Sequence, residues 1–386
     1  MKDNNTHKKV LFVLPSYRYG GTITSFKNLL ALLYGKYEIH VKAIVNEGKN
    51  YDYISKFAHM LDKRNIDASQ FVMSYKSSTK RLIAKGCKNF LAKIGIDVAP
   101  LILKRQAKRF DCSEYDAVIG FQEGYATYFV SRTNAKNKIA WIHSIYSRLL
   151  KLEGKDGIGA YDKIDKIVCV SETAKRDFCE TRNSAHDDIR VVYNALDSDL
   201  VKRMSNESVT TEHFDGFKLI SVGRIDPVKR FSRIPSIVAA LKRKGLKIRW
   251  TIVGGTAVQS EFDLLQSEIL KYNVADDVIQ KGQCANPYPY IKHSDLLVCL
   301  SSSETFNYTL AEARTLGVPV ITTDFPAASE FVEHGVNGYI TSIDNLANEI
   351  YSLLTGEGNY QKAKKDVAEF EYDNKLIKSQ FAGLFE

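Results

Sequence analysis

The pattern with the clearest chemical use is a pair of glutamates, Glu304 and Glu312, in Ser301-Ser-Ser-Glu-Thr-Phe-Asn-Tyr-Thr-Leu-Ala-Glu312. This stretch directly follows the apolar run 295–300. A helix that begins there presents unpaired N–H groups and a positive dipole end, which suits a diphosphate. The two carboxylates would lie roughly 12 Å apart along the axis, too far to share one proton or one metal. They suit hydroxyl groups on opposite sides of a phosphate, although a helix-start carboxylate and a solvated one would give the same pattern.

Two cations follow an earlier apolar run, 217–222, in Ser-Val-Gly223-Arg224-Ile-Asp-Pro-Val-Lys229. We expect Arg224 to leave the end of a strand and Lys229 to start the next helix. An Arg fork and a Lys point charge can hold phosphate oxygens and stabilise a diphosphate leaving group. Arginine and lysine side chains that are simply exposed on the surface would give the same pattern.

Two further candidates lie nearer the N-terminus. Gly20 and Gly21 follow the run 9–14 and would let a backbone approach a ligand, or simply make a tight turn. His143 ends the run 138–143, where it could bind a sugar hydroxyl or assist proton transfer, or be a structural residue. Asp197-Ser-Asp199 is interpreted as turn residues, and with no clustered histidines or cysteines we expect no metal site.

Along the chain, apolar β-branched runs alternate with amphipathic segments of helix length, and the candidate residues follow the apolar runs. This alternation predicts an α/β fold. The pattern restarts after Asn194, so we expect two doubly wound Rossmann-like units that face a central cleft. The polar stretch 204–215 marks the junction, giving domains at 1–205 and 216–372. The expected strands are 9–14, 38–45, 70–74, 116–121, 138–143, 166–170, 217–222, 247–253, 278–281, 295–300 and 319–323, and the expected helices include 22–34, 51–64, 172–182, 230–244, 257–271, 306–317 and 344–355.

Composition fits a folded soluble protein, with 44% hydrophobic and 26% charged residues. The six cysteines are scattered and form no Cys-x-x-Cys pair, which indicates reduced thiols in a cytosolic protein. No apolar run approaches the length of a membrane span, so we expect a cytoplasmic protein, peripheral at most. The segment from Lys80 to Phe110 contains nine Lys/Arg residues and only one acidic residue. Such a basic amphipathic stretch could bind anionic lipid head groups, or it could simply be exposed to solvent. The sequence contains no recognisable nucleic-acid-binding module, so we expect no nucleic-acid partner.

The motifs together resemble glycosyltransferase family 4, whose members have the two-domain GT-B fold, retain the donor's anomeric configuration and need no metal or other cofactor. The motifs that appear in the family's order and spacing are Gly223-Arg224…Lys229, Val253-Gly254-Gly255, Glu304…Glu312-Ala, Gly317-Val-Pro-Val-Ile and Glu330…Gly335-Val-Asn-Gly338-Tyr. The final stretch from Asp373 resembles the segment (373–386) that returns to the first domain.

By that resemblance, the donor would be a UDP-linked sugar. Arg224 and Lys229 would hold its diphosphate, while Glu304 would hold the sugar and Glu312 the ribose. In the acceptor-binding first domain, Gly20 and Gly21 would approach the phosphate and His143 would contact the transferred sugar. Thr305 stands where the family has glycine, which leaves the preferred sugar open. The donor site would also include Gly223, Gly254, Thr305, Phe306, Asn307 and Tyr308.

The resemblance implies a retaining hexosyl- or N-acetylhexosaminyltransferase for a lipid-linked or cell-envelope glycan, as in bacterial surface-polysaccharide assembly. Two alternatives remain open from the sequence. The acceptor could be soluble, or the chain could be a sugar-nucleotide-binding partner subunit with no turnover of its own.

Overall fold

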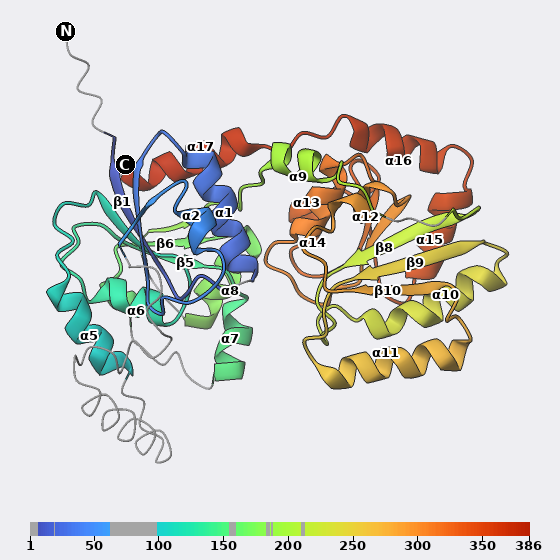
Figure 1. Cartoon of the computed structure of the whole chain (residues 1–386), viewed down its shortest axis with the longest axis horizontal. Helices are drawn as coiled ribbons and strands as arrows, with labels where there is room; N and C mark the ends of the chain where they lie inside the picture. Colours follow the sequence, from blue (N-terminus) through green and yellow to red (C-terminus); the bar gives the residue numbers. More distant parts are fainter. Residues whose placement is uncertain are drawn as a thin grey trace, which may run out of the picture. The chain divides into compact units, whose positions relative to one another are not determined.

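The structure is a computed structural model that describes residues 7–18, 20–61, 99–153, 160–182, 186, 188–209 and 213–386. The chain divides into two compact units (Figure 1). The first unit is Met1–Ala195 together with Asn374–Glu386, and the second unit is Leu196–Asp373. Of the basic stretch Lys80–Phe110, only residues from 99 onward fall within the described part, and the expected strand 70–74 lies outside it.

The first unit is built on a seven-stranded sheet in the order β3-β2-β1-β4-β5-β6-β7. Every pairing in it is parallel. The strand order reverses between β1 and β4, which creates a topological switch point, where ligands of doubly wound folds bind. The strands are β1 Lys9–Leu14, β2 Glu38–Ala43, β3 His59–Met60, β4 Ala117–Gly120, β5 Lys138–Ile142, β6 Lys166–Cys169 and β7 Ile189–Val191.

The second unit repeats this design with a six-stranded parallel sheet in the order β10-β9-β8-β11-β12-β13. Its switch point lies between β8 and β11. The predicted α/β class with two doubly wound units is therefore confirmed. The strands are β8 Phe217–Val222, β9 Ile248–Val253, β10 Val278–Gly282, β11 Leu296–Cys299, β12 Val320–Thr323 and β13 Tyr339–Thr341.

Helices connect successive strands in both units (Figure 1). Those of the first unit are α1 Gly21–Leu33, α2 Tyr51–Ile54, α5 Ala99–Arg109, α6 Tyr125–Ser131, α7 Tyr146–Glu153, α8 Glu172–Arg182 and α17 Asn374–Ala382. Those of the second unit are α9 Ser198–Met204, α10 Ile234–Arg243, α11 Gln259–Tyr272, α12 Tyr288–Lys292, α13 Tyr308–Thr315, α14 Ala328–Phe331, α15 Leu346–Thr355 and α16 Asn359–Ala368. Among the helices that the structure describes, none has the length and apolarity needed to cross a bilayer.

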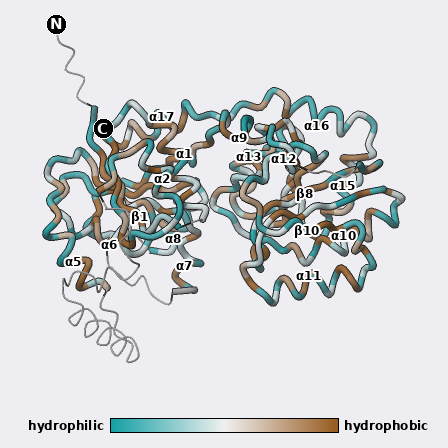
Figure 2. The backbone as a smooth tube through the Cα atoms, in the orientation of Figure 1, coloured by the Kyte–Doolittle hydropathy of each residue, from teal (hydrophilic) through white to brown (hydrophobic). Residues whose placement is uncertain are grey.

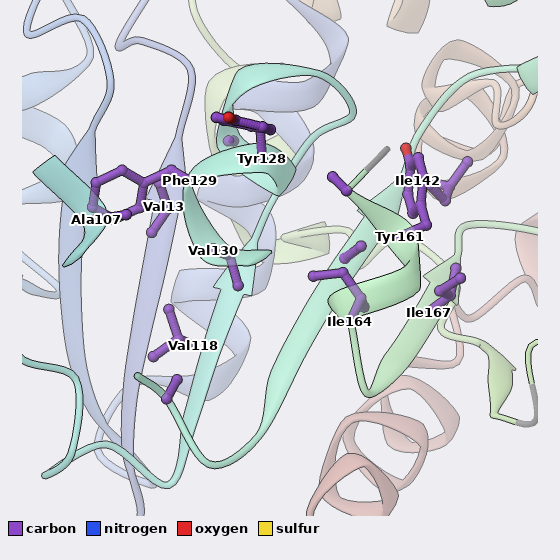
Figure 3. Packing of buried hydrophobic residues seen from close by; sticks show 14 of the residues in the cluster. Val13, Ala107, Val118, Tyr128, Phe129, Val130, Ile142, Tyr161, Ile164 and Ile167 are labelled. Carbon is purple, nitrogen blue, oxygen red and sulfur yellow. The ribbon is translucent and has the colours of Figure 1, made fainter. Parts of the chain in front are cut away.

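The cores follow the apolar strands. Hydrophobic residues concentrate along the strands in the middle of each unit, whereas α11 alternates between hydrophobic and hydrophilic positions (Figure 2). This is the pattern expected for parallel sheets covered on both faces by amphipathic helices. Figure 3 shows part of the first unit's core, where Val13 of β1, Ala107 of α5 and Phe129 of α6 pack together.

One predicted helix is wrong. The segment 51–64 was expected to be helical, but α2 ends at Ile54 and the chain then forms β3, in which His59 and Met60 pair with His40 and Val41 of β2. Sheet pairing at the edge outweighs the weak local helix pattern. The short strands β7 and β13, of three residues each, lie outside the predicted set because such runs carry too little periodicity to detect.

The division of the chain falls earlier than the expected boundary at 205. Helix α9 belongs to the second unit, where Val201 packs with Ala311 of α13. After Asp373 the chain returns to the first unit, and α17 lies beside α1 (Figure 1). There Phe381 is fully buried and its ring packs against Phe12 and Tyr37.

Candidate functional site

The loops at the second unit's switch point carry the chemistry predicted from the sequence. The loop after β8 runs from Gly223 to Arg230, and the loop after β11 runs from Leu300 to Asn307. Because β8 and β11 are paired and parallel, both loops leave the sheet at the same edge. They bring together Lys229 and Glu304, two residues 75 positions apart in the sequence.

The centre of the site is an ion pair between the Nζ atom of Lys229 and the Oε1 atom of Glu304, 2.6 Å apart. Both side chains are largely enclosed, with 19% and 16% of their surfaces exposed. The hydroxyl of Ser301 donates a second hydrogen bond to Oε1 of Glu304, at 2.7 Å. Burial lowers the pKa of Lys229, but the carboxylate of Glu304 outweighs it and the net pKa is raised. Lys229 is therefore a fixed cation throughout the physiological range.

A tight turn presents Lys229, and this differs from the prediction that Lys229 starts a helix. The carboxylate of Asp226 accepts hydrogen bonds from the backbone N–H groups of Val228 and Lys229, each at 3.0 Å. Arg230 then takes a left-handed conformation, and a 3₁₀ turn over 231–233 leads into α10. The turn breaks the helix pattern because Asp226 supplies a side-chain acceptor for the backbone.

Arg224 stands apart from the ion pair. Its guanidinium is 77% exposed and lies 3.5 Å from the carboxylate of Asp226. This pairing leaves most of the guanidinium open to solvent, and a planar guanidinium suits phosphate oxygens.

Gly223 and Gly254 hold the two neighbouring loops at close range. A Cβ atom at position 254 would lie 1.7 Å from the carbonyl oxygen of Gly223, so only glycine fits there. A Cβ atom at position 223 would lie 3.0 Å from Cε of Lys229, which shows that the lysine side chain runs over this glycine. The two glycines therefore shape the loop that carries the cations.

Helix α13 starts at Tyr308, two residues after the predicted start at 306, and Asn307 caps it. The Oδ1 atom of Asn307 accepts from the backbone N–H of Leu310 at 3.3 Å, and its amide donates to Sγ of Cys299 at 3.0 Å. These contacts fix the helix start against β11. The ring of Phe306 packs against those of Tyr308 and Phe331, and Thr305 is half-buried beside it.

Glu312 lies in the second turn of α13 and is separate from the Lys229–Glu304 pair. Only 6% of Glu312 is exposed, and its Oε1 atom accepts a hydrogen bond from the hydroxyl of Tyr288 at 3.2 Å. Burial raises the pKa of Glu312 to about 7. The sequence analysis missed Tyr288, whose place in Asn-Pro-Tyr-Pro-Tyr carries no spacing signal.

In the first unit, the loop after β1 carries Gly20 and Gly21. A Cβ atom at either position would meet nothing within 4 Å, so packing against the described residues does not require glycine at these two sites, although Gly20 has a positive φ of 158°. Gly48 is the glycine that this loop demands, since its Cβ would fall 2.0 Å from the backbone of Tyr17.

His143 follows β5 directly, as predicted, and a buried carboxylate lies beside it. The Oε1 atom of Glu123 accepts from the backbone N–H groups of His143 and Ser144, at 2.7 and 2.6 Å. The imidazole packs 4.8 Å from the ring of Phe121, and burial lowers the pKa of His143 to about 3. His143 is therefore a neutral imidazole. Glu123 was missed, although a lone carboxylate after the predicted strand 116–121 was the signal for it.

The Asp197-Ser-Asp199 triplet is a helix cap, in line with its interpretation as turn residues. The Oδ1 atom of Asp197 accepts from the backbone N–H of Leu200 at 2.9 Å, at the start of α9. Within the described ranges, no group of three or more His, Cys, Asp or Glu side chains is placed to hold a metal ion.

The second unit, which carries this site, is similar to known glycosyltransferases. Residues 206–370 match the family model "Glycosyl transferases group 1". The chain is 24% identical over 207 residues to N-acetyl-alpha-D-glucosaminyl L-malate synthase of Bacillus anthracis, covering 51% of this chain and 53% of that protein. It is 25% identical over 146 residues to the capsular polysaccharide biosynthesis glycosyltransferase CapM of Staphylococcus aureus, covering 37% and 38%. The chain thus spans about half, or less, of the length of these relatives.

Solved structures match over nearly the whole chain. Anabaena HepE in complex with UDP and glucose superposes with a TM-score of 0.70 at 18% identity, covering 98% of this chain and 99% of that one. TarM of S. aureus gives a TM-score of 0.69 at 15% identity, covering 98% and 99%. At these identities the likeness concerns the fold, and it confirms the predicted GT-B class. The stretch that matches the glycosyltransferase group 1 family model, residues 206–370, contains the Lys229–Glu304 site.

Proposed function

We propose that this protein is a retaining, metal-independent GT-B glycosyltransferase of family 4 that uses a UDP-linked hexose or N-acetylhexosamine. The observation that carries the proposal is the enclosed Lys229–Glu304 pair at the switch point of a glycosyltransferase group 1 domain. Ligands of doubly wound folds bind at that place. HepE, which shares the fold, has been solved with UDP-glucose.

The two cations and the N-terminus of α13 would stabilise the negative charge of the leaving group. Lys229 supplies a fixed positive charge and Arg224 an exposed guanidinium, and together they would stabilise the departing diphosphate on the face from which the acceptor attacks. Glu304 is held by Lys229 and Ser301, so its second oxygen would accept from a sugar hydroxyl. Thr305 next to it would narrow the space around that sugar.

The other site residues would act on the remaining parts of the donor and on the acceptor. Glu312 would bind the ribose hydroxyls and Asn307 would fix the helix start that faces the phosphates. In the first unit, neutral His143 would accept or donate a hydrogen bond to the transferred sugar, and the open backbone at Gly20 and Gly21 would admit the phosphate and acceptor.

A lipid-linked or cell-envelope glycan is the acceptor that we propose. Two relatives support it: CapM is named for capsular polysaccharide biosynthesis, and a relative from Bacillus subtilis is named poly(glycerol-phosphate) alpha-glucosyltransferase. A soluble acceptor and a non-catalytic binding subunit are the competing possibilities.

The donor is tested with a panel of UDP-, GDP-, ADP- and dTDP-sugars, scored by thermal shift and by release of the nucleoside diphosphate. We expect a UDP-sugar to raise the unfolding temperature and to release UDP when a polysaccharide or lipid-linked acceptor is added. Release that needs only a small soluble sugar would favour the soluble acceptor. Binding without release under any condition would identify a binding subunit, and no shift with any nucleotide would contradict the proposal.

A membrane contact through α5 is the second element of the proposal. Leu103 and Ala107 of this helix are buried against the first unit, while Lys104, Arg105, Lys108 and Arg109 are exposed on its other face. Leu101 is 68% exposed beside them. Four cations and an apolar side chain on one face suit the surface of an anionic bilayer.

Reversing the charges of Lys104, Arg105, Lys108 and Arg109 to glutamate should abolish cosedimentation with phosphatidylglycerol vesicles, because each cation near an anionic surface contributes about 1 kcal/mol. The unfolding temperature should stay the same, since the four side chains are exposed. Reversing Arg243, the last residue of α10, and Lys244, which follows it in the second unit, is the control. Equal sedimentation of all three proteins would contradict the membrane contact.

A further inference from the structure

Arg230 has a backbone conformation that its residue type does not favour. Its φ angle is 51°, and among the described non-glycine residues only Asn273 shares a positive φ. Asn273 ends α11, a position where asparagine is common. Arginine has no such local preference, because its Cβ crowds the backbone and its long side chain cannot satisfy the turn. Some contact beyond the turn must therefore hold Arg230 there.

The guanidinium of Arg230 makes that contact across the switch point. Its Nε atom donates to the carbonyl oxygen of Leu300 at 2.6 Å, and Nη2 donates to the carbonyl oxygen of Ser301 at 2.9 Å. Leu300 and Ser301 are the first residues after β11, where the strand's hydrogen-bonding ladder has ended. One fork from the β8 loop thus binds two successive carbonyls of the β11 loop.

Two further bonds hold the β11 loop, one from the β8 loop and one from β12. The backbone N–H of Ser302 donates to the carbonyl of Val228 at 2.8 Å, and the hydroxyl of Thr323 donates to the carbonyl of Ser301 at 2.6 Å. The Ser301 carbonyl is therefore held from two sides, by Arg230 and by β12. This fixes the start of the β11 loop to the body of the sheet.

The connection reaches both groups that hold Glu304. Arg230 directly follows Lys229, which forms the ion pair with Glu304. Its side chain binds Ser301, whose hydroxyl is the other partner of the same carboxylate. Arg230 is therefore connected to both groups that hold the carboxylate, to Lys229 through the backbone and to Ser301 through its side chain.

We propose that Arg230 is the positioning residue of the Lys229–Glu304 pair, setting through its two carbonyl contacts the separation of the loops that grip the donor. The effect on turnover rests on the proposed function. The effect on the ion pair rests on the geometry alone.

Arg230→Gly tests the proposal because glycine adopts a φ of 51° without strain. We expect this variant to fold, yet to release UDP from its donor up to about 100-fold more slowly, since a displacement of about 1 Å can cost that much. Methylguanidinium chloride, at concentrations that leave the unfolding temperature unchanged, should restore part of the rate. Arg230→Asn, also tolerant of the left-handed region, should behave in the same way and be rescued less.

Arg233→Ala is the matched control, since its exposed guanidinium pairs with Asp344 and touches neither loop. This variant should release UDP at the wild-type rate, and methylguanidinium should not change that rate. Wild-type turnover by both Arg230 variants, or slow turnover that methylguanidinium leaves unchanged, would overturn the proposal.

A second measurement needs no activity. We expect Glu304→Gln to lower the unfolding temperature of the wild type clearly, and that of Arg230→Gly much less, because the pair is already displaced there. Equal decreases in both backgrounds would mean that Arg230 does not position the pair. If the wild-type protein turned over no nucleotide-sugar, the proposed function would fail, while this cycle would still decide the role of Arg230.

Discussion

Glu304→Gln is expected to slow nucleoside-diphosphate release by about 100-fold, a loss typical of removing one charged contact that is strengthened in the transition state. The amide keeps the size of the carboxylate, so the loop after β11 should retain its course. It removes the negative partner of Lys229 and the acceptor proposed for the sugar hydroxyl. The measurement is steady-state UDP release with the donor identified by the panel.

Loss of the ion pair could also act through stability, and a double variant separates the two effects. Lys229→Met together with Glu304→Gln leaves no unpaired charge, so its unfolding temperature should recover toward that of the wild type. Its activity should stay low, because both proposed contacts with the donor are absent. Recovery of activity together with stability would refute a role in catalysis. Glu268→Gln, which breaks the exposed pair with Lys271 on α11, should change neither property.

Glu312→Gln is expected to stabilise the protein at pH 8 and to leave its stability at pH 4.5 nearly unchanged. The pKa of Glu312 is raised by burial to about 7, against 4.5 for an ordinary glutamate, so the folded state binds this proton more tightly than the unfolded state. The stability of the wild type therefore falls as the pH rises from 4.5 to 7, and the loss is complete above pH 7. At about 1.4 kcal/mol for each pKa unit, the ionised carboxylate costs on the order of 3 kcal/mol.

Glutamine should remove this cost, since it is neutral and its oxygen can still accept from Tyr288. Denaturant unfolding at both pH values measures the difference. The same variant should bind UDP more weakly, because the ribose hydroxyls lose a charged acceptor. Tyr288→Phe is the informative comparison, since loss of the donor raises the pKa of Glu312 further and should destabilise the protein at pH 8. Equal stability of the wild type and Glu312→Gln at pH 8 would contradict the prediction.

The architecture was largely accessible from the sequence because its signals are local and repeated. Strands such as β8 and β11 are continuous apolar runs, and the polar residues that follow them mark the switch point without any knowledge of pairing. Glu304 and Lys229 could be placed in one site by this rule alone. The exact contact between them could not, since it depends on the turn at Asp226.

Some residues could not be predicted from the sequence because their contacts depend on the folded structure. Glu123 is a single carboxylate that matters because the backbone of β5 arrives beside it. Arg230 has an ordinary residue type at an unusual backbone angle, and no spacing rule reveals a φ of 51°. The helix expected over 51–64 failed for a related reason, since β3 is stabilised by a strand nearly twenty residues away.

The return of the chain to the first unit has a consequence for how the protein is made. The second unit is one continuous stretch, Leu196–Asp373, inserted into the first, which is completed only by the last thirteen residues. Phe381 fills the core beside Phe12, while Arg190 and Lys166 bind the carbonyls of Gly383 and Leu384. On the ribosome, the unit that is synthesised first must wait until residues 374–386 have been made, so the inserted unit can fold before the first one is complete. Loss of residues 374–386 would therefore damage the first unit, although most of that unit is encoded more than 170 residues earlier.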